Sequence, residues 1–268
     1  MESFLKLQLL AIVQGLTEFL PVSSSGHLAL LKHWLGVESG EGPVLELLLH
    51  GGTLLAILAF YRKRLLDLLA GLLRRAKETW HYAAMVVLCC VPAGLLYLAA
   101  HDFLEQAFQS PRAIGAFLVL TSAILFSLKK LPDAPPGGTT EEGTAAPGWR
   151  QALGIGFAQA MAILPGVSRS GSTYTAARWL KVPGKEAFDF SFLVSVPLIL
   201  GSILLKAKEL HSMATQGENA LSLACATLLA ALVGYVALAA LAKLHFRGKI
   251  WLFAPYCLAL GLLALLLA

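Results

Sequence analysis

Two long stretches without a charged side chain decide what this chain can fold into. Residues 220–242 and residues 250–268 contain no Asp, Glu, Lys or Arg over 23 and 19 positions. A helix of about 20 apolar residues crosses the hydrocarbon core of a bilayer. Only 14% of the chain is charged, whereas soluble proteins average about 25%. The sequence therefore predicts an integral membrane protein and excludes a soluble globular domain.

Four further stretches bring the number of expected membrane spans to six. They are residues 43–61, 81–100, 113–128 and 190–205. The stretch at 81–100 contains Pro92 and Gly94. Both are tolerated in lipid because neighbouring helices can satisfy the backbone groups that they leave free.

Two other apolar segments, residues 4–35 and 149–180, are interrupted near their middle by Pro, Gly and Ser and match each other. The first reads QGLTEFLPVSSSGHLALLKHWL from Gln14, and the second reads QAMAILPGVSRSGSTYTAARWL from Gln159. At an offset of 145 the identical pairs are Gln14 and Gln159, Val22 and Val167, Ser23 and Ser168, Ser25 and Ser170, Gly26 and Gly171, Trp34 and Trp179, and Leu35 and Leu180. The repeat predicts a single membrane domain over 1–268, with repeat one at 1–130, a linker at 131–148 and repeat two at 149–268.

The distribution of Lys and Arg indicates how the two broken segments sit in the membrane. If each is a re-entrant hairpin, fifteen basic residues fall on one side and five on the other. If each crosses once, the division is twelve against eight. The positive-inside rule favours the hairpins, which then enter from opposite faces and meet near the midplane. The expected fold is an all-α integral membrane protein with six transmembrane helices and two re-entrant helical hairpins in inverted-topology repeats.

The broken segments also carry polar side chains that are costly in lipid. Their ionisable residues are Glu18, His27 and Arg169, and their hydroxyl residues are Ser23, Ser24, Ser25, Ser168, Ser170, Ser172 and Thr173. An ionisable group at membrane depth indicates a functional site. Two structural explanations stay open: Glu18 and Arg169 could form only a buried ion pair, and the serines could only pack helices together.

The runs VSSSGH and GVSRSGST have the chemistry of a phosphate site. Each places Ser and Gly at a break before a helix, where free backbone N–H groups attract an anion. Arg169 adds a planar guanidinium group that matches phosphate oxygens. His27 lies within one turn of Ser24, so it could move a proton to or from a hydroxyl group. Glu18 could orient that imidazole or share a divalent metal.

These motifs resemble those of the undecaprenyl-diphosphate phosphatase family, the BacA-type bacitracin-resistance proteins. The resemblance covers essentially the whole chain and is carried by QGLTEFLPVSSSGH at 14–27 and PGVSRSGST at 165–173, with HGGT at 50–53 as weaker support. It implies a membrane enzyme that removes the terminal phosphate of a C55 polyprenyl diphosphate. The product is the monophosphate carrier that cell-wall synthesis reuses, and the reaction confers bacitracin resistance. The resemblance also implies a site open to the outer face.

The resemblance assigns roles to individual positions. It implies Glu18 as the essential acid, Ser24 as the hydroxyl nucleophile, His27 as the histidine of the site and Arg169 as the phosphate-binding arginine. The expected substrate-binding residues are Gln14, Ser23, Ser25, Gly26, Ser168, Ser170, Gly171 and Thr173. Some members carry a second acid where this chain has Gln14. A Mg²⁺ or Ca²⁺ ion would therefore depend on Glu18, the substrate phosphates and water, and no organic cofactor is expected.

Two mechanisms and one rival function stay open from the sequence. Ser24 could attack the terminal phosphorus with His27 as its base, or His27 could activate water while Ser24 only binds. The rival is a polyprenyl-phosphate flippase or transporter, or a protein with both activities, because carriers often contain inverted repeats with broken helices.

The remaining predictions concern partners and location. We expect a polyprenyl diphosphate lipid and the bilayer as partners and no nucleic acid, and we leave a homodimer open. We expect a multi-pass protein of the cell membrane, which is the inner membrane in a Gram-negative cell, with its active site opening to the periplasmic or extracellular side. His50 has lower weight, because a histidine beside Gly51 and Gly52 is about as readily explained by packing.

Overall fold

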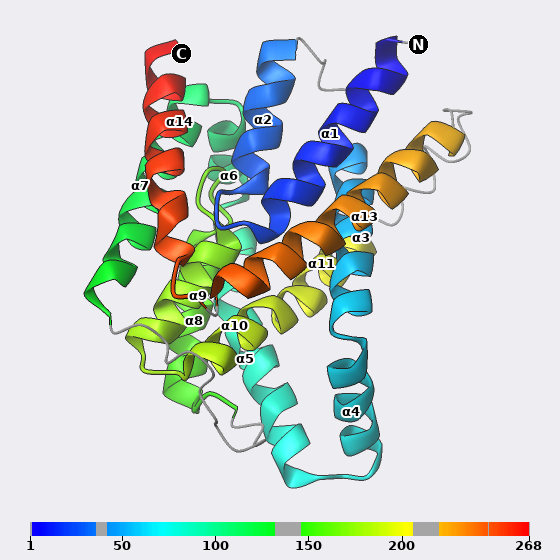
Figure 1. The fold of residues 1–268 in the computed structure, drawn as a ribbon, viewed down its shortest axis with the longest axis vertical. Helices are drawn as coiled ribbons and strands as arrows, with labels where there is room; N and C mark the ends of the chain where they lie inside the picture. Colours follow the sequence, from blue (N-terminus) through cyan, green and yellow to red (C-terminus); the bar gives the residue numbers. More distant parts are fainter. Residues whose placement is uncertain (1, 36–41, 132–145, 206–219, 246, 268) are drawn as a thin grey trace.

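The computed structural model describes residues 2–35, 42–131, 146–205, 220–245 and 247–267, and every regular element in these ranges is a helix (Figure 1). The helices are α1 (Glu2–Phe19), α2 (Ser24–Leu35), α3 (Gly42–Phe60), α4 (Arg62–Leu73), α5 (Lys77–Ala99), α6 (His101–Phe108), α7 (Pro111–Ser127), η1 (Leu128–Lys130), α8 (Trp149–Met161), α9 (Arg169–Trp179), α10 (Gly184–Leu193), α11 (Ser195–Leu205), α13 (Ala220–His245), η2 (Ile250–Phe253) and α14 (Ala254–Leu267).

Five segments of this structure are long and apolar enough to cross a membrane. They are Lys77–Ala99, Pro111–Lys130, Gly184–Leu205, Leu221–His245 and Ile250–Leu267. The pair Leu45–Phe60 and Arg62–Leu73, bent by 78°, is a sixth candidate. Leu98 and Leu266 are 79% and 82% exposed, as expected of side chains that lipid solvates. The prediction of an all-α membrane protein is confirmed, and each of the six predicted stretches overlaps one of these candidates.

The predicted stretch at 190–205 differs most from the structure in where it begins. The helical run starts at Gly184 rather than at residue 190, so Lys185, Glu186 and Asp189 belong to α10. The charged residues that end an apolar run do not end a helix, because their backbone N–H and C=O groups continue the same hydrogen bonds.

The chain turns back on itself between α1 and α2. Pro21 has no N–H group to continue the α1 ladder, and Ser23 has a φ of 70°, in the left-handed region. The Ser23 hydroxyl oxygen then accepts a hydrogen bond from the Gly26 N–H at 3.3 Å and caps α2, which begins at Ser24. The start of α1 and the end of α2 both lie at the top of Figure 1.

A second turn between helices joins α8 to α9. Gly166 has a φ of 104°, and an added Cβ would lie 2.5 Å from the carbonyl oxygen of Ile114, so the turn requires glycine there. Ser168 caps α9 by accepting from the Gly171 N–H at 3.1 Å. Helix α9 begins at Arg169, 145 residues after the start of α2 at Ser24, as the repeat predicts. The entry of both hairpins into the membrane as re-entrant segments stays a prediction.

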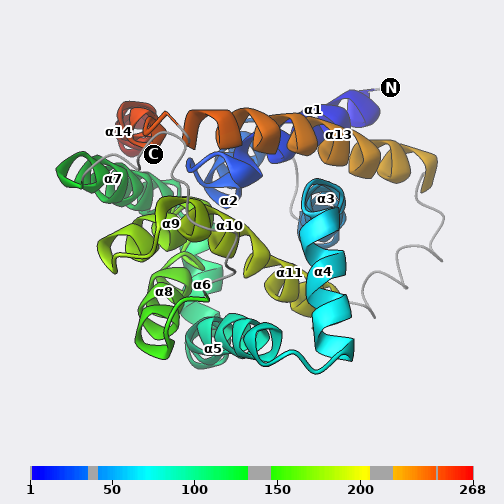
Figure 2. The same cartoon turned by 60° about the horizontal axis from the view of Figure 1, so that its bottom comes forward.

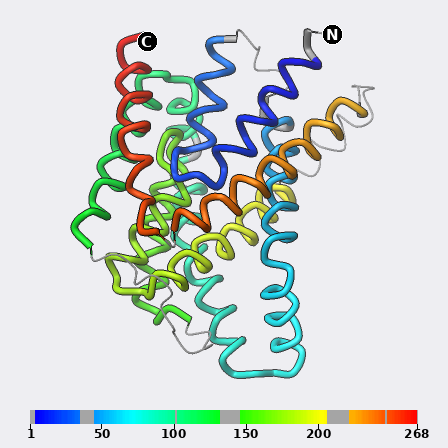
Figure 3. Tube along the Cα trace, in the orientation of Figure 1, coloured from blue at the N-terminus to red at the C-terminus, as the bar shows by residue number. Residues whose placement is uncertain are grey.

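The tips of the two hairpins touch, as the Cα path in Figure 3 helps to follow. The Gly166 N–H donates to the Ser23 hydroxyl at 3.1 Å across the turns. Thr121 of α7 holds the second tip, because its hydroxyl donates to the Gly166 carbonyl at 2.7 Å and accepts from the Ser168 N–H at 3.0 Å. In Figure 1, α8 and α9 lie below the turn of the first hairpin.

Helices from the two predicted repeats interlock. Helix α1 lies along α13, α8 lies along α5, and α7 lies beside α14 (Figure 2). An added Cβ at Gly15 would lie 2.8 Å from the Ala230 carbonyl, and one at Gly156 would lie 2.6 Å from the Cys89 carbonyl. The glycines thus let each hairpin pack closely on a helix of the other repeat. Small residues of α13 therefore form a packing contact within the chain. The predicted linker at 131–148 lies mostly outside the described residues, and the inverted orientation of the repeats stays a prediction.

Candidate active site

The carboxylate of Glu18 is the centre of the polar cluster between the hairpins. The Arg169 Nη2 atom lies 2.6 Å from Glu18 Oε1. The Ser24 hydroxyl donates to Glu18 Oε2 at 2.6 Å. The Glu18 side chain is only 6% exposed and that of Arg169 is 16% exposed. The structure therefore brings together three of the four residues expected to be catalytic.

The helix ends place these three groups. Glu18 lies in the last turn of α1, Ser24 begins α2 and Arg169 begins α9. The acid and the hydroxyl thus come from one hairpin and the cation from the other. The second guanidinium nitrogen of Arg169, Nη1, donates to the Ser191 carbonyl of α10 at 3.4 Å. Since that bond is long, Nη1 is the nitrogen that a phosphate oxygen could engage while Nη2 stays on Glu18.

Gln14 supports the carboxylate from one turn earlier on α1. Its Nε2 donates to Glu18 Oε2 at 3.0 Å, and its side chain is fully buried. Its Oε1 atom has no hydrogen-bond partner among the described residues. Gln14, which is predicted to bind substrate, holds Glu18 in the structure.

The serines and glycines of the two motifs form matching caps. The hydroxyl oxygens of Ser23 and Ser25 lie 3.3 Å apart, and so do those of Ser168 and Ser170. Each first serine also binds the N–H of the motif glycine, Gly26 or Gly171. The N-termini of α2 and α9 therefore adjoin at the tips, with their positive ends near Glu18 and Arg169.

Several residues of the second motif that are predicted to bind substrate are buried and use their hydroxyl groups in hydrogen bonds within the protein. Ser168, Ser170 and Thr173 are at most 4% exposed. The Thr173 hydroxyl donates to the Arg169 carbonyl at 2.8 Å, and the Ser170 hydroxyl donates to the Leu20 carbonyl at 3.4 Å. These hydroxyls shape the second tip and attach it to the first, and their role in binding substrate stays a prediction.

His27 lies on the other side of the first α2 turn. Its Nδ1 is 2.7 Å from the Ser23 carbonyl, and its Nε2 is 2.7 Å from the hydroxyl of Tyr256 on α14. The two rings stack with centroids 5.6 Å apart. The expected pairing of His27 with Ser24 and Glu18 differs from this arrangement, because Ser24 bonds to Glu18 and the ring of His27 turns toward α14.

Two residues of the cluster, His50 and Tyr256, are difficult to recognise from the sequence. His50 Nε2 lies 3.5 Å from Glu18 Oε2, and the only signal for it is the HGGT run inside an apolar stretch. Tyr256 has no signal, because it is a single aromatic residue near the start of the last span. Both are recognisable only once α3 and α14 are placed against the hairpins.

The residues present do not build a metal site by themselves. Within the described ranges, no group of three or more His, Cys, Asp or Glu side chains is placed to hold an ion. Both oxygens of Glu18 are engaged, Oε1 by Arg169 and Oε2 by Ser24 and Gln14. Mg²⁺ and Ca²⁺ need several oxygen ligands, so an ion ligated mainly by diphosphate and water stays a prediction.

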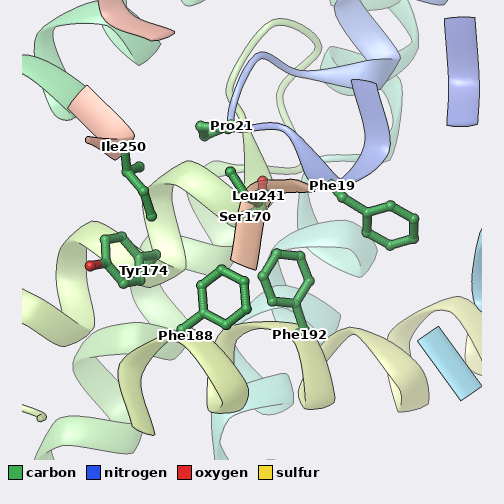
Figure 4. A pocket seen from close by; sticks show the side chains of 8 residues that line it. All are labelled: Phe19, Pro21, Ser170, Tyr174, Phe188, Phe192, Leu241 and Ile250. Atoms are coloured by element: carbon green, nitrogen blue, oxygen red, sulfur yellow. The ribbon is translucent and has the colours of Figure 1, made fainter. Parts of the chain in front are cut away.

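The structure also has a small apolar pocket (Figure 4). It is lined by Phe19, Pro21, Ser170, Tyr174, Phe188, Phe192, Leu241 and Ile250. Phe188 and Phe192 point from α10 toward Phe19 and Ser170. Two of the lining residues are sequence neighbours of the charged groups, because Phe19 follows Glu18 and Ser170 follows Arg169.

Comparisons with known proteins agree over nearly the whole chain. The family described as "Bacitracin resistance protein BacA" matches residues 7–263. A protein of Rhodopirellula baltica named undecaprenyl-diphosphatase is 37% identical over 268 residues, covering 100% of this chain and 99% of the relative. Proteins with the same name from Desulfatibacillum aliphaticivorans and Desulfosudis oleivorans are 34% and 38% identical, with 96% and 94% of each chain covered.

Proposed function

Since this chain belongs to the bacitracin resistance protein BacA family, we propose that it hydrolyses undecaprenyl diphosphate to undecaprenyl phosphate and inorganic phosphate. The observation that carries the proposal is the convergence of Ser24, Glu18 and Arg169 from two hairpins. A hydroxyl bonded to a buried carboxylate beside a cation can attack phosphorus. Pure phosphate binding would not need that hydroxyl–carboxylate pair.

Ser24 acts as the nucleophile and Glu18 as its base in this proposal. The 2.6 Å bond already points the hydroxyl proton of Ser24 at Glu18 Oε2. Attack forms a bond from Ser24 Oγ to the terminal phosphorus and breaks the bond to the bridging oxygen, which leaves on undecaprenyl phosphate. Water then attacks the phosphoserine, releases inorganic phosphate and restores Ser24. In the one-step alternative, water attacks the diphosphate directly and Ser24 only binds.

Arg169 stabilises the charge on the phosphoryl group in transfer. Phosphoryl transfer depends mainly on positioning and on such stabilisation. Arg169 can keep Nη2 on Glu18 and turn Nη1 from the Ser191 carbonyl to a phosphate oxygen. This use of one guanidinium group explains how a buried arginine could serve the acid and the substrate together.

The lipid tail stays in the bilayer while the headgroup enters the cluster. The exposed aliphatic faces of the helices support such a route. The excess of basic residues expected at the cytoplasmic side supports an opening to the periplasmic or extracellular face of the cell membrane. The relatives named above support a phosphatase rather than a transporter. A homodimer stays a prediction.

Phosphate release in detergent tests the proposal, because it needs no second compartment. We expect the purified protein to release phosphate from C55 diphosphate. We expect Ser24→Ala to lose about 10³-fold or more in kcat. Ser202→Ala is the matched control, since Ser202 is an exposed serine on α11 whose hydroxyl bonds the Leu198 carbonyl. A wild-type protein without phosphatase activity would refute the proposed function.

Trapping separates the two mechanisms. Rapid acid quenching with substrate labelled in the terminal phosphate should leave label on Ser24. Near-normal turnover by Ser24→Ala would exclude the covalent route and leave direct attack by water.

A further inference from the structure

His50 lies close to Glu18 Oε2, the same carboxylate oxygen that accepts the hydrogen bond from the Ser24 hydroxyl. His50 Nε2 lies 3.5 Å from Glu18 Oε2, and the Ser24 hydroxyl bonds to that oxygen at 2.6 Å. The His50 side chain is 28% exposed, whereas that of Glu18 is 6% exposed. The imidazole therefore lies between the buried carboxylate and a more open part of the structure.

Close packing on α13 fixes His50 opposite Glu18. An added Cβ at Gly52 would lie 2.3 Å from the carbonyl oxygen of Thr227. Gly15 of α1 makes a similar approach, because its added Cβ would lie 2.8 Å from the Ala230 carbonyl. Thus α1 and α3 each press backbone against neighbouring turns of one helix, which sets both their spacing and their rotation. This packing presents Glu18 and His50 to each other.

The bond at the other ring nitrogen determines the tautomer of His50. Its Nδ1 lies 2.7 Å from the Glu46 carbonyl. A carbonyl oxygen only accepts hydrogen bonds, so Nδ1 carries a proton. In the neutral imidazole, Nε2 is then an acceptor that faces Glu18 Oε2, another acceptor. A proton between the two atoms converts this pair from repulsive to attractive.

We propose that His50 is a positioning residue for Glu18, whose Nε2 takes up the proton that Glu18 accepts from Ser24. This inference rests on the proposed phosphatase reaction. The proton passes from Ser24 Oγ to Glu18 Oε2 and then to His50 Nε2, which leaves an imidazolium beside a carboxylate. When water cleaves the phosphoserine, the proton returns along the same path to the departing Ser24 oxygen. Glu18 is thereby anionic again before each attack.

The charged groups around His50 are consistent with this role. Glu18 faces it from α1, with Arg169 of α9 on the far oxygen of that carboxylate. Lys32 of α2 pairs with Glu46, one turn before His50 on α3. Helix α11 has no charged residue, and α13 has none before Lys243. Among the described residues, the Glu18 carboxylate is the charged group that the structure places beside Nε2 of the ring.

The kinetic test replaces His50 by a side chain that keeps polarity but cannot take up a proton. We expect His50→Gln to lower kcat about 10- to 100-fold with KM changed less than about twofold. The acidic limb of the pH profile of kcat should disappear or move to lower pH, because His50 must be neutral to accept the proton. His33→Gln is the matched control, since His33 is exposed on α2. An unchanged kcat and acidic limb in His50→Gln would overturn the inference.

A second measurement separates failure of this inference from failure of the proposed function. The imidazole resonance of His50 is followed by NMR in detergent and assigned by its loss in His50→Gln. We expect this resonance to move in Glu18→Gln, since the neighbouring carboxylate is removed, while the His33 resonance stays unchanged. A His50 resonance that is identical in both proteins would overturn the inference whether or not the protein releases phosphate. Matching thermal unfolding of the variants confirms that each is folded.

Discussion

The two hairpins have the same local frame and different chemistry. Both use a serine to cap the returning helix, with hydroxyl-to-amide distances of 3.3 Å at Gly26 and 3.1 Å at Gly171. At the offset of 145, the positions of the reactive groups are among those that differ. In this alignment of the two repeats, Glu18 matches Ile163, Ser24 matches Arg169 and His27 matches Ser172.

The two hairpins thus separate the residues that form the turns from the residues that carry the chemistry. The matching pairs Ser23 and Ser168, and Gly26 and Gly171, form the caps at the tips. Positions that differ supply an acid, a hydroxyl and a cation once each. A symmetric site with two acids or two arginines would repel itself in a medium of low dielectric. The asymmetric division instead lets the hairpins attract each other through Glu18 and Arg169.

The largest expected effect comes from removing the cation that only the second hairpin supplies. Arg169→Met should lower kcat/KM about 10³-fold or more. It should also destabilise the protein by about 3–5 kcal/mol, because Glu18 is left buried without its partner. Phosphate release and thermal unfolding measure the two losses separately.

The double variant Glu18→Gln with Arg169→Met distinguishes a site from a structural ion pair. It should recover most of the lost stability, since no unpaired charge remains, and stay inactive. Recovery of activity together with stability would show that the pair only holds the hairpins together.

The paired glutamines give a second comparison between the hairpins. Gln14 donates to Glu18, whereas Gln159 at the matching position donates to the Cys89 carbonyl of α5 at 3.2 Å. Gln14→Met should lower kcat about 10-fold, because a bond to a charged group contributes about 1.5–3 kcal/mol. Gln159→Met should change the unfolding temperature and leave kcat within about twofold. Equal kinetic effects would contradict the division of roles.

The caps test how far the shared frame is symmetric. Ser23 holds two N–H groups, those of Gly26 and Gly166, while the Ser168 hydroxyl holds that of Gly171. Replacing a capping serine by alanine costs about 1 kcal/mol. Ser168→Ala should lose about that amount and Ser23→Ala about twice as much, as measured by chemical unfolding. A larger loss in Ser168→Ala would mean that the second tip, not the first, holds the hairpins together.

The sequence predicts the features that depend on local pattern. Apolar runs without charge mark the spans, and Pro, Gly and Ser mark the two turns, so α2 and α9 begin where the repeat places them. The approach of Arg169 to Ser24 and Glu18 follows from the repeat and the charge distribution. Each of these inferences needs only a local pattern, the internal repeat or the positive-inside rule.

The sequence does not predict which way a helix is rotated. The partner of His27 is Tyr256, 229 residues away, and no spacing links the two. His50 reaches Glu18 because Gly52 lies against the Thr227 carbonyl of α13, a tertiary contact invisible in the HGGT run. The expected pairing of His27 with Ser24 therefore rests on proximity in the chain, and the helix rotation directs the imidazole elsewhere.

The smallest expected effect concerns that histidine. The Ser23 carbonyl can only accept, so His27 carries its proton on Nδ1 and Nε2 accepts from the Tyr256 hydroxyl at 2.7 Å. Tyr256→Phe removes one hydroxyl and keeps the stacked ring. A neutral hydrogen bond contributes about 1 kcal/mol, so we expect kcat to fall about two- to fivefold as the first turn of α2 loses its tie to α14. Tyr235→Phe, on α13, is the matched control and should change neither kcat nor stability. A rise in kcat in Tyr256→Phe would instead mean that the hydrogen bond to Tyr256 keeps His27 Nε2 away from Ser24. His27, rather than Glu18, would then be the base.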